Sequence, residues 1–259
     1  MNLTQSKVAL ITGASRKAGI GAAIARELAR AGADIFIAYY RPYDHEVGLA
    51  DDPDEPQSFL AELRELGRRA DGFELDLSDP RAPRSLFDRV EAAVGPVTIL
   101  VNNAVRSLRD GIENLNADHL DKHYAINVRA MALLCAEFVR RYKQDLPQRS
   151  GGRIINLSSG QGLNPMPGEL AYAATKGAVE AFTRSLSAEV ARLGITVNAV
   201  DPGATDTGWI ASELKEKWAA ESPMGRIGAP EDAARLIRFL ASAEAEWITG
   251  QIIHSRGGR

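Results

Sequence analysis

Short apolar runs alternate with helical patterns along the chain. The runs lie at residues 8–11, 34–38, 97–101, 153–157, 196–200 and 251–253. Between the first two, apolar residues recur at spacings of four and three, which defines one face of a helix (Ile20, Ile24, Leu28 and Ala31). Near-continuous apolar runs are typical of strands buried on both faces of a parallel sheet. With one more strand expected just before Asp76, the alternation predicts an α/β fold, a doubly wound (Rossmann) domain with a mainly parallel seven-stranded sheet and helices on both faces.

Two segments depart from this rhythm, although no linker or shift in composition divides the chain, so residues 1–259 are expected to form a single domain. Residues 41–56 are polar and acidic with three prolines, and we interpret them as a solvated loop in preference to a functional one. Residues 203–228 follow the sixth strand, and sheets of this kind bind ligands at the carboxyl ends of their strands. We expect this segment to form a substrate-covering loop; the alternative is a permanently packed helix with Trp209 and Trp218 in the core.

Composition narrows the classes of partner. The chain has 259 residues, of which 45% are hydrophobic and 25% charged, with a formal net charge of −3. This charge gives no electrostatic reason to expect a nucleic-acid partner, and no apolar stretch is long enough to span a membrane. Because the first seven residues are polar and lack a secretory apolar core, we expect a cytoplasmic protein. The single cysteine, Cys135, lies in an apolar helical pattern and is expected to be a buried, inert thiol.

No metal site is predicted from the histidines. His119 and His123 stand four residues apart on an expected helix, which suits a metal, but no third ligand is apparent. A serine hydrolase is also disfavoured, because no Gly-x-Ser-x-Gly elbow surrounds Ser159.

A glycine-rich turn, residues 12–21, joins the first strand to the first helix. Glycines let the backbone approach a pyrophosphate closely, and a helix N-terminus supplies free N–H groups and a favourable dipole. Glycines also serve plain turns, but the strand-turn-helix context favours dinucleotide binding. The candidate cofactor contacts in this turn are Gly13, Ser15, Arg16, Lys17, Gly19, Ile20 and Gly21.

Tyr172 and Lys176 form the most informative pair in the chain. Residues four apart lie on one face of a helix, so the phenol and the ammonium project together. A phenol with a pKa near 10 is a poor acid or base at neutral pH. A neighbouring cation favours the phenolate and brings this pKa toward the working range. Ser159 ends a predicted strand 13 residues before Tyr172.

The glycine-rich turn, Ser159 and the Tyr172–Lys176 pair together resemble the short-chain dehydrogenase/reductase family, over roughly residues 7–258. By this resemblance, Tyr172 donates the proton in reduction and is the base in oxidation, and Ser159 holds the substrate oxygen. Lys176 binds the nicotinamide ribose and lowers the pKa of Tyr172. The family's spacing selects Ser159 over Ser158, and Asn127 matches the helix asparagine that holds a water in the proton relay.

The resemblance also implies the remaining contacts with a nicotinamide cofactor. Asp76, Leu77, Asn103 and Ala104 match the adenosine side, and Pro202, Gly203, Thr205, Thr207, Tyr172 and Lys176 match the nicotinamide side. Thr207 stands where the family binds the carboxamide, and Thr205 could share that contact. The sequence departs from the family pattern in two places. Five residues separate Gly13 from Gly19 where the family usually has three, and Val105 replaces a glycine.

The end of the second strand bears on which nicotinamide cofactor is used. NAD-specific members place an acid there, which bonds the ribose 2′-hydroxyl. In this chain the place falls on Tyr39, followed by Tyr40 and Arg41. Without a carboxylate there, and with Arg16, Lys17 and Arg41 supplying guanidinium and ammonium groups that suit a phosphate, we expect NADP(H). The acidic run in residues 44–55 argues the other way.

These residues predict an NADP(H)-dependent oxidoreductase that reduces a ketone to a secondary alcohol. Residues 152–155 and 194–198 resemble 3-oxoacyl-(acyl-carrier-protein) reductases, which implies a carbonyl or acyl-thioester substrate. One alternative is an NAD(P)-dependent alcohol or polyol dehydrogenase that works toward oxidation. A remote alternative is a catalytically idle nucleotide-binding regulator, which the presence of Tyr172 and Lys176 disfavours. The family commonly pairs the helices corresponding to 117–144 and 171–193, so we expect a homotetramer.

Overall fold

A parallel sheet forms the centre of the computed structural model, which describes residues 7–49, 52–144 and 151–258. Within these residues the seven strands lie in the order β3-β2-β1-β4-β5-β6-β7, and every neighbouring pair is parallel. The strands are β1 (Val8–Thr12), β2 (Asp34–Tyr39), β3 (Ala70–Glu74), β4 (Ile99–Asn102), β5 (Gly152–Leu157), β6 (Ile195–Asp201) and β7 (Ile252–His254). The predicted doubly wound α/β fold is confirmed.

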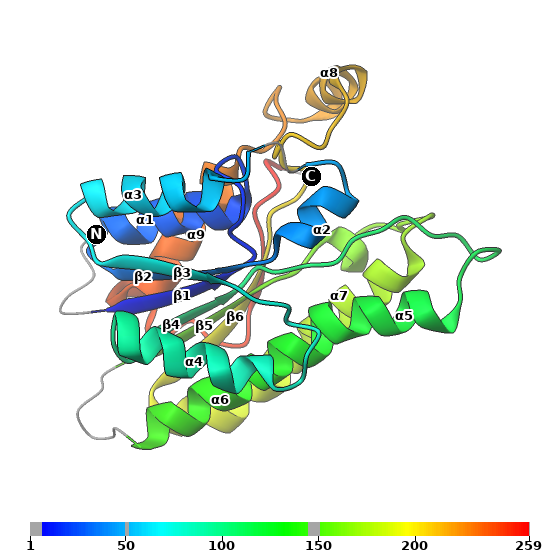
Figure 1. Cartoon of the computed structure of the whole chain (residues 1–259). Helices are drawn as coiled ribbons and strands as arrows, with labels where there is room; N and C mark the ends of the chain where they lie inside the picture. Colours follow the sequence, from blue (N-terminus) through cyan, green and yellow to red (C-terminus); the bar gives the residue numbers. More distant parts are fainter. Residues whose placement is uncertain (1–6, 50–51, 145–150, 259) are drawn as a thin grey trace.

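Helices cover both faces of the sheet (Figure 1). One face carries α1 (Ile20–Arg30), α3 (Glu55–Glu65) and α9 (Pro230–Ala241), and the other carries α4 (Ala82–Ala93), α6 (Met131–Gln144) and α7 (Leu170–Val190). The helix α5 (Ala117–Tyr124) runs through a π-helical segment, η1 (Ala125–Ala130), into α6. Single 3₁₀ turns lie at η2 (Gly160–Gly162), η3 (Ala191–Leu193) and η4 (Ala243–Ala245). Among the described helices, none is long and apolar enough to cross a membrane.

Two short helices lie beyond the carboxyl ends of the strands. α2 (Arg41–Glu46) follows β2, and α8 (Ser212–Glu221) stands away from the sheet (Figure 1). None of the residues of α8 is buried, whereas Ile210 just before it is. Trp209 is half exposed and meets the edge of Trp218 at a ring separation of 6.1 Å. The alternative of a helix packed with both tryptophans in the core is therefore wrong.

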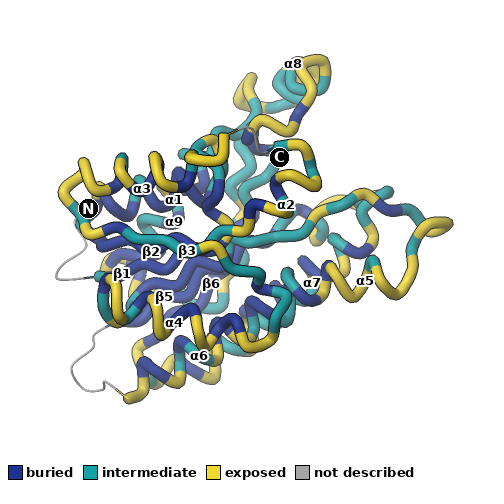
Figure 2. The backbone as a smooth tube through the Cα atoms, in the orientation of Figure 1, coloured by how far each residue is buried: buried dark blue, intermediate teal, exposed yellow. Residues whose placement is uncertain are grey.

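Burial explains why the central strands read as continuous apolar runs. All residues of β1, β4, β5 and β6 are buried (Figure 2). Side chains on one face of the sheet pack against α1, α3 and α9, and those on the other pack against α4, α6 and α7. Cys135 lies in the second layer, and burial raises the pKa of its thiol to about 12. The thiol is therefore protonated and inert at neutral pH, as predicted.

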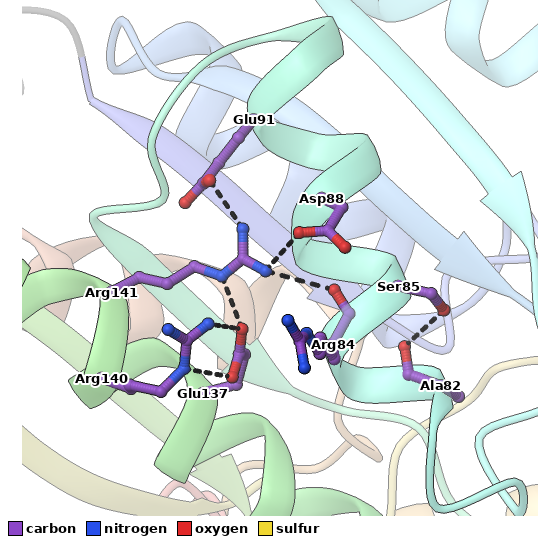
Figure 3. Close-up of polar contacts among 8 residues, drawn as sticks. All are labelled: Ala82, Arg84, Ser85, Asp88, Glu91, Glu137, Arg140 and Arg141. Atoms are coloured by element: carbon purple, nitrogen blue, oxygen red, sulfur yellow. Dashed lines mark hydrogen bonds and ion pairs between the residues drawn. The ribbon is translucent and has the colours of Figure 1, made fainter.

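An arginine joins α6 to α4, two of the helices that cover the second face of the sheet. Arg141 of α6 donates to Asp88 and Glu91 of α4 and to Glu137 of its own helix (Figure 3). The guanidiniums of Arg140 and Arg141 together lower the pKa of Glu137 to about 2. Since Arg141 has only 9% of its side chain exposed, its charge is compensated by carboxylates, as the burial of a cation requires.

The solvated loop expected at residues 41–56 is wrong. The segment begins with α2 and ends in the first turn of α3, and Arg41 and Asp44 are buried. Pro42 sits in the first turn of α2, a position where a missing N–H costs nothing. Asp51, which belongs to the acidic run, lies outside the described residues.

Candidate active site

A cavity of about 720 Å³ opens where the strands of one half of the sheet end. Its volume is in the range of small-ligand and cofactor pockets. Walls come from the glycine-rich turn, α2, the segment after β3, the loop after β4 and the first turns of η1. Eleven of the candidate cofactor residues line it: Gly13, Ser15, Arg16, Gly19, Ile20, Tyr40, Asp76, Leu77, Asn103, Ala104 and Thr207.

The glycine-rich turn is held against the end of β4. Gly13 has a φ of +71°, and a Cβ there would lie 2.6 Å from the Cα of Ala104. At Gly21, a Cβ would lie 2.8 Å from Nδ2 of Asn103. That amide donates to the carbonyl oxygens of Thr12 and Gly13 at 2.9 and 2.8 Å. Glycine is required at these two positions because the backbones approach so closely.

The two extra residues of the turn are absorbed before the helix begins. The N–H of Gly19 donates to the carbonyl of Arg16 at 3.0 Å, and α1 starts at Ile20. Gly19 provides no side-chain cap, and the first turn of α1 holds no acid. The free N–H groups and the dipole at this end are therefore available to an anion at the cavity wall. A cradle of glycine backbone beside an uncapped helix end fits the pyrophosphate of a dinucleotide.

Two of the three expected cations do not line the cavity. Arg41 is buried with a nitrogen 3.9 Å from an oxygen of Glu55, and the backbone N–H of Lys17 donates to the same carboxylate at 2.6 Å. Arg16 does line it, and its guanidinium donates to the carbonyl of Thr207 at 2.8 Å. The positive charge on this side of the cavity therefore comes from Arg16.

The cavity wall includes polar and charged residues that were not expected there, among them three from α2 and one from the loop after β4. Asp44, Tyr43 and Glu46 of α2 and Arg106 of the loop after β4 all line it. The three residues of α2 were not expected because their segment was interpreted as a loop. A proline in the second position of a segment is typical of a helix start, and Pro42 could have indicated α2. The sequence places no carboxylate at the end of β2. In the structure a carboxylate does reach the cavity, from Asp44 of α2.

Ser159, Tyr172 and Lys176 come together as predicted. Ser159 lies two residues beyond the end of β5, close enough to Tyr172 of α7 to act on its pKa. Nζ of Lys176 lies 5.6 Å from the centre of the Tyr172 ring and donates to the carbonyl of Leu157 at 2.7 Å. Lys176 is buried, whereas Ser159 and Tyr172 are partly exposed and accessible to a substrate.

Ser158 has a different role from Ser159. Its hydroxyl is buried and donates to Glu180 of α7 at 2.8 Å. Gln161, just beyond Ser159, donates to the same carboxylate oxygen at 2.7 Å. Glu180 therefore fixes the chain on both sides of Ser159, and the choice of Ser159 as the accessible hydroxyl agrees with this geometry.

Burial governs the acid–base state of the pair on α7. It raises the pKa of Tyr172 to about 12, although the hydrogen bond from Ser159 pulls the other way. It also lowers the pKa of Lys176 to about 8, against the attraction of Asp201. Desolvation of the phenolate outweighs the groups that favour it, and the expectation that Lys176 lowers the phenol pKa stays a prediction. The phenol is thus a protonated hydroxyl at neutral pH.

Asn127 lies in the π-helical segment η1 and is almost fully buried. Its Oδ1 accepts from the N–H of Arg106 at 2.8 Å, and its Nδ2 donates to the carbonyl of Arg106 and to Oγ1 of Thr175, both at 2.9 Å. Single-turn π-helical insertions occur frequently at functional sites. This one splits the long helix expected at 117–144 and ties the loop after β4 to α7.

The N-terminus of α7 is capped by a residue far away in the sequence. Asp110 accepts from the N–H groups of Leu170 and Ala171 at 2.5 and 2.8 Å, and His119 lies 3.3 Å from its second oxygen. A carboxylate on free N–H groups at the positive end of a helix is stabilising. Asp110 therefore fixes α7 one residue before Tyr172.

The end of β6 approaches the catalytic set from the other side. Asp201 is fully buried and receives hydrogen bonds from the N–H of Gly203 and from Arg256, at 2.9 and 3.1 Å. Its second oxygen also lies 2.9 Å from Nδ1 of His254. A Cβ at Gly160 would overlap the Arg256 guanidinium, so Arg256 packs beneath the turn that follows Ser159.

Other candidate contacts lie outside the 720 Å³ cavity. Besides Lys17 and Arg41, these are Gly21, Tyr172, Lys176, Pro202, Gly203 and Thr205. Pro202 lines a second cavity of about 300 Å³ beside α8. Thr205 is buried, and its hydroxyl is within 3.2 Å of the carbonyl oxygens of Pro202 and Gly203. Of the two threonines considered for the carboxamide, Thr207 is the one at the cavity wall.

Comparison with known proteins agrees with this site. Residues 13–259 match the family model described as enoyl-(acyl carrier protein) reductase. An oxidoreductase of Bacillus subtilis called YjdA is 50% identical over 258 residues, covering 100% of this chain and 98% of that protein. A 3-oxoacyl-(acyl-carrier-protein) reductase of Staphylococcus aureus is 34% identical and covers 99% of both chains. A short-chain dehydrogenase of Burkholderia cenocepacia, solved in complex with NADP, superposes with a TM-score of 0.86 at 34% identity and 99% coverage of both chains.

The chain belongs to the short-chain dehydrogenase/reductase family and is an oxidoreductase close to 3-oxoacyl-(acyl-carrier-protein) reductase-like members. The resemblance inferred from the glycine-rich turn and the Ser159, Tyr172 and Lys176 spacing is confirmed.

Proposed function

We propose that this protein reduces a ketone, such as a 3-oxoacyl thioester, to a secondary alcohol with NADP(H), and that Tyr172 donates the proton. The observation that carries the proposal is that Ser159, Lys176 and the partly exposed phenol of Tyr172 come together at the end of the sheet, with the phenol protonated at neutral pH. A protonated phenol is the form that a reduction requires. Oxidation, the reaction of the alternative alcohol or polyol dehydrogenase, would need the phenolate, which burial disfavours.

The residues of the chain divide the work of such a reduction. When bound, the nicotinamide supplies the hydride. The hydroxyls of Ser159 and Tyr172 would hold the carbonyl oxygen and polarise it, and Tyr172 would transfer its proton as negative charge develops there. Lys176 would bond the ribose from the same face of α7, where its ammonium also faces the Tyr172 ring. Thr207 would hold the carboxamide, and the uncapped start of α1 would bind the pyrophosphate.

Three observations support NADP(H) as the cofactor. Arg16 lines the cavity, and no acid stands at Tyr39 or Tyr40 at the end of β2. The Burkholderia relative was solved with NADP. Adenosine contacts would come from Asp76, Leu77 and the Asn103-Ala104 turn, all of which line the same cavity.

The test is a substrate panel followed by nicotinamide absorbance. The purified chain is mixed with NADPH or NADH and with acetoacetyl-coenzyme A, ethyl acetoacetate or a simple cyclic ketone. We expect loss of absorbance with at least one 3-oxo compound, and a kcat/KM at least about tenfold higher for NADPH than for NADH, which corresponds to about 1.4 kcal/mol. No turnover in any arm with a chain that binds NADPH would contradict the proposed reaction, and equal efficiency would contradict the cofactor.

We further propose that residues 203–228 cover the substrate. The segment follows the carboxyl end of β6, and Gly203, Gly208 and Gly225 all have a positive φ and can act as hinges. α8 buries no residue in the described structure, so little packing holds it in place. A helix of this kind can exclude water from the site when ligand is bound.

A homotetramer is proposed from two separate apolar surfaces. Leu120 and Tyr124 of α5 and Leu133 of α6 are exposed, and Trp247, in the segment between η4 and β7, is 95% exposed. Two different self-complementary contacts generate a tetramer with crossed two-fold axes. Light scattering should give about four times the chain mass of 27.9 kDa. A mass of one or two chains at micromolar concentration would contradict the tetramer.

A further inference from the structure

The helix α2 places a carboxylate inside the cavity proposed for the cofactor. Asp44 lines the cavity beside Ser15 and Arg16. Its Oδ1 lies 3.6 Å from Nε of Arg16, an ion pair at the cavity wall. The guanidinium that the glycine-rich turn offers to an anion is thus already paired with an anion of the chain itself.

Asp44 is held in this place by the rest of α2. The hydroxyl of Tyr43 accepts from the N–H of Ser107 at 2.9 Å, and Arg106 donates two hydrogen bonds to Glu46 at 2.6 and 2.9 Å. These contacts join α2 to the loop after β4, on the far side of the cavity. The position of Asp44 therefore follows from the fold of the segment and not from one flexible side chain.

The carboxylate is poorly compensated where it lies. Asp44 is 7% exposed, and within the described part of the chain its buried Oδ2 has no hydrogen-bond partner. Burial raises the pKa of Asp44, which Ser15, Arg16 and Arg41 oppose. Burying a carboxylate oxygen without a hydrogen-bond donor costs free energy. The Asp44 carboxylate is therefore in an unfavourable environment in this cavity.

We propose that Asp44 determines how strongly this chain distinguishes NADP(H) from NAD(H), because its carboxylate holds the groups that a 2′-phosphate would use. The proposal rests on the proposed function, since it takes the cavity as the cofactor site. A phosphate and a carboxylate on the same guanidinium repel each other. Asp44 thus weakens the binding of the phosphorylated cofactor, and NAD(H), which carries no 2′-phosphate, is affected much less.

A different role for the same carboxylate gives the opposite result. In NAD-specific members an acid bonds the ribose 2′-hydroxyl. If Asp44 did so, removing its charge would weaken NADH and leave NADPH without a gain. The variant Asp44→Asn separates the two roles, because it keeps the size of the side chain and removes the charge.

The experiment measures equilibrium binding by titration calorimetry with wild type, Asp44→Asn and Glu46→Gln. The ligands are NADPH, NADH, adenosine 2′,5′-bisphosphate and adenosine 5′-monophosphate. For Asp44→Asn we expect the Kd of NADPH and of adenosine 2′,5′-bisphosphate to fall at least about tenfold, with less than about a twofold change for the other two. Glu46→Gln is the matched control, since Glu46 lies on the same helix and lines the same cavity but pairs with Arg106.

Each other outcome has a defined meaning. Weaker binding of NADH to Asp44→Asn would overturn the proposal in favour of a ribose contact. The proposal would also be overturned if Asp44→Asn tightened the binding of ligands with and without a 2′-phosphate equally, or if Glu46→Gln showed the same selective increase in affinity. In neither case would the effect come from repulsion between Asp44 and a 2′-phosphate. Failure of the wild type to bind either dinucleotide would instead contradict the proposed function.

Discussion

Nδ2 of Asn127 donates to Oγ1 of Thr175 at 2.9 Å, and the same Oγ1 donates to the carbonyl of Tyr172 at 2.8 Å. These hydrogen bonds connect the π-helical segment to α7 at a position between Tyr172, the proposed proton donor, and Lys176. Replacing Asn127 by Ala removes the hydrogen bond to Thr175 and the two hydrogen bonds to the Arg106 backbone. We expect kcat to fall by about 10- to 100-fold with a smaller change in the Kd of NADPH, since small displacements of a reacting group cost this much.

Thr175 provides the matched pair of variants for this contact. Thr175→Ser keeps the hydroxyl and should retain most of the activity, whereas Thr175→Val keeps the shape and should resemble Asn127→Ala in kcat. Circular dichroism and thermal melting check that each variant is folded. Full activity in Thr175→Val would contradict the positioning role.

Tyr172→Phe removes the transferable proton and keeps the ring. A positioned general acid typically contributes 10²- to 10⁴-fold, so we expect kcat to fall by at least about 100-fold. The Kd of NADPH should change by less than about threefold, because the ring stays in place beside Lys176. Near-wild-type turnover in this variant would show that the assigned acid is wrong.

The pH dependence of kcat/KM should follow the protonation state of Lys176. Burial lowers the pKa of its ammonium to about 8, whereas the pKa of Tyr172 is raised to about 12. As the pH rises through about 8, Lys176 loses its proton while the phenol keeps its own. We therefore expect kcat/KM for ketone reduction to fall above about pH 8, and Lys176→Arg, which stays charged, to lose this fall in whatever activity remains. A profile that stays flat to pH 10 would contradict the need for a charged Lys176.

Residues 205–224 should change their exchange of amide hydrogens when ligands bind. We expect fast exchange in the free protein and slower exchange with NADPH and acetoacetyl-coenzyme A together, because the segment would close over the site. Peptides from β1 and β4, whose residues are all buried in the sheet, serve as the internal control. Strong protection of the amides of residues 205–224 in the absence of ligand would contradict this prediction and would mean that the segment is permanently packed.

Strands and the catalytic set were accessible from sequence because each has a local signature. The buried strands read as apolar runs, and Tyr172 and Lys176 share a helix face by their spacing alone. The third strand was harder, because β3 lies at the edge of the sheet and contains Asp71 and Gly72. An edge strand is buried less and needs no continuous apolar run.

The contacts that complete the site are made across long stretches of chain. Asp110 caps α7 from 60 residues away, and Asp44 reaches Arg16 from a segment that looks like a solvated loop. No local periodicity encodes such pairs, since they depend on how the loops pack once the sheet has formed. The raised pKa of Tyr172 belongs to the same class, because the burial that causes it comes from several separate elements.

The central claim is that a hydride passes from the nicotinamide to a carbonyl carbon in this site. The most direct test uses NADPH that carries deuterium on the transferable side of C4, with acetoacetyl-coenzyme A as the acceptor. The account predicts a 3-hydroxy product with one deuterium on the carbinol carbon and a single configuration, which mass spectrometry and chiral chromatography detect. A product without deuterium, or full retention of the label in the nicotinamide while acetoacetyl-coenzyme A is consumed, would contradict it.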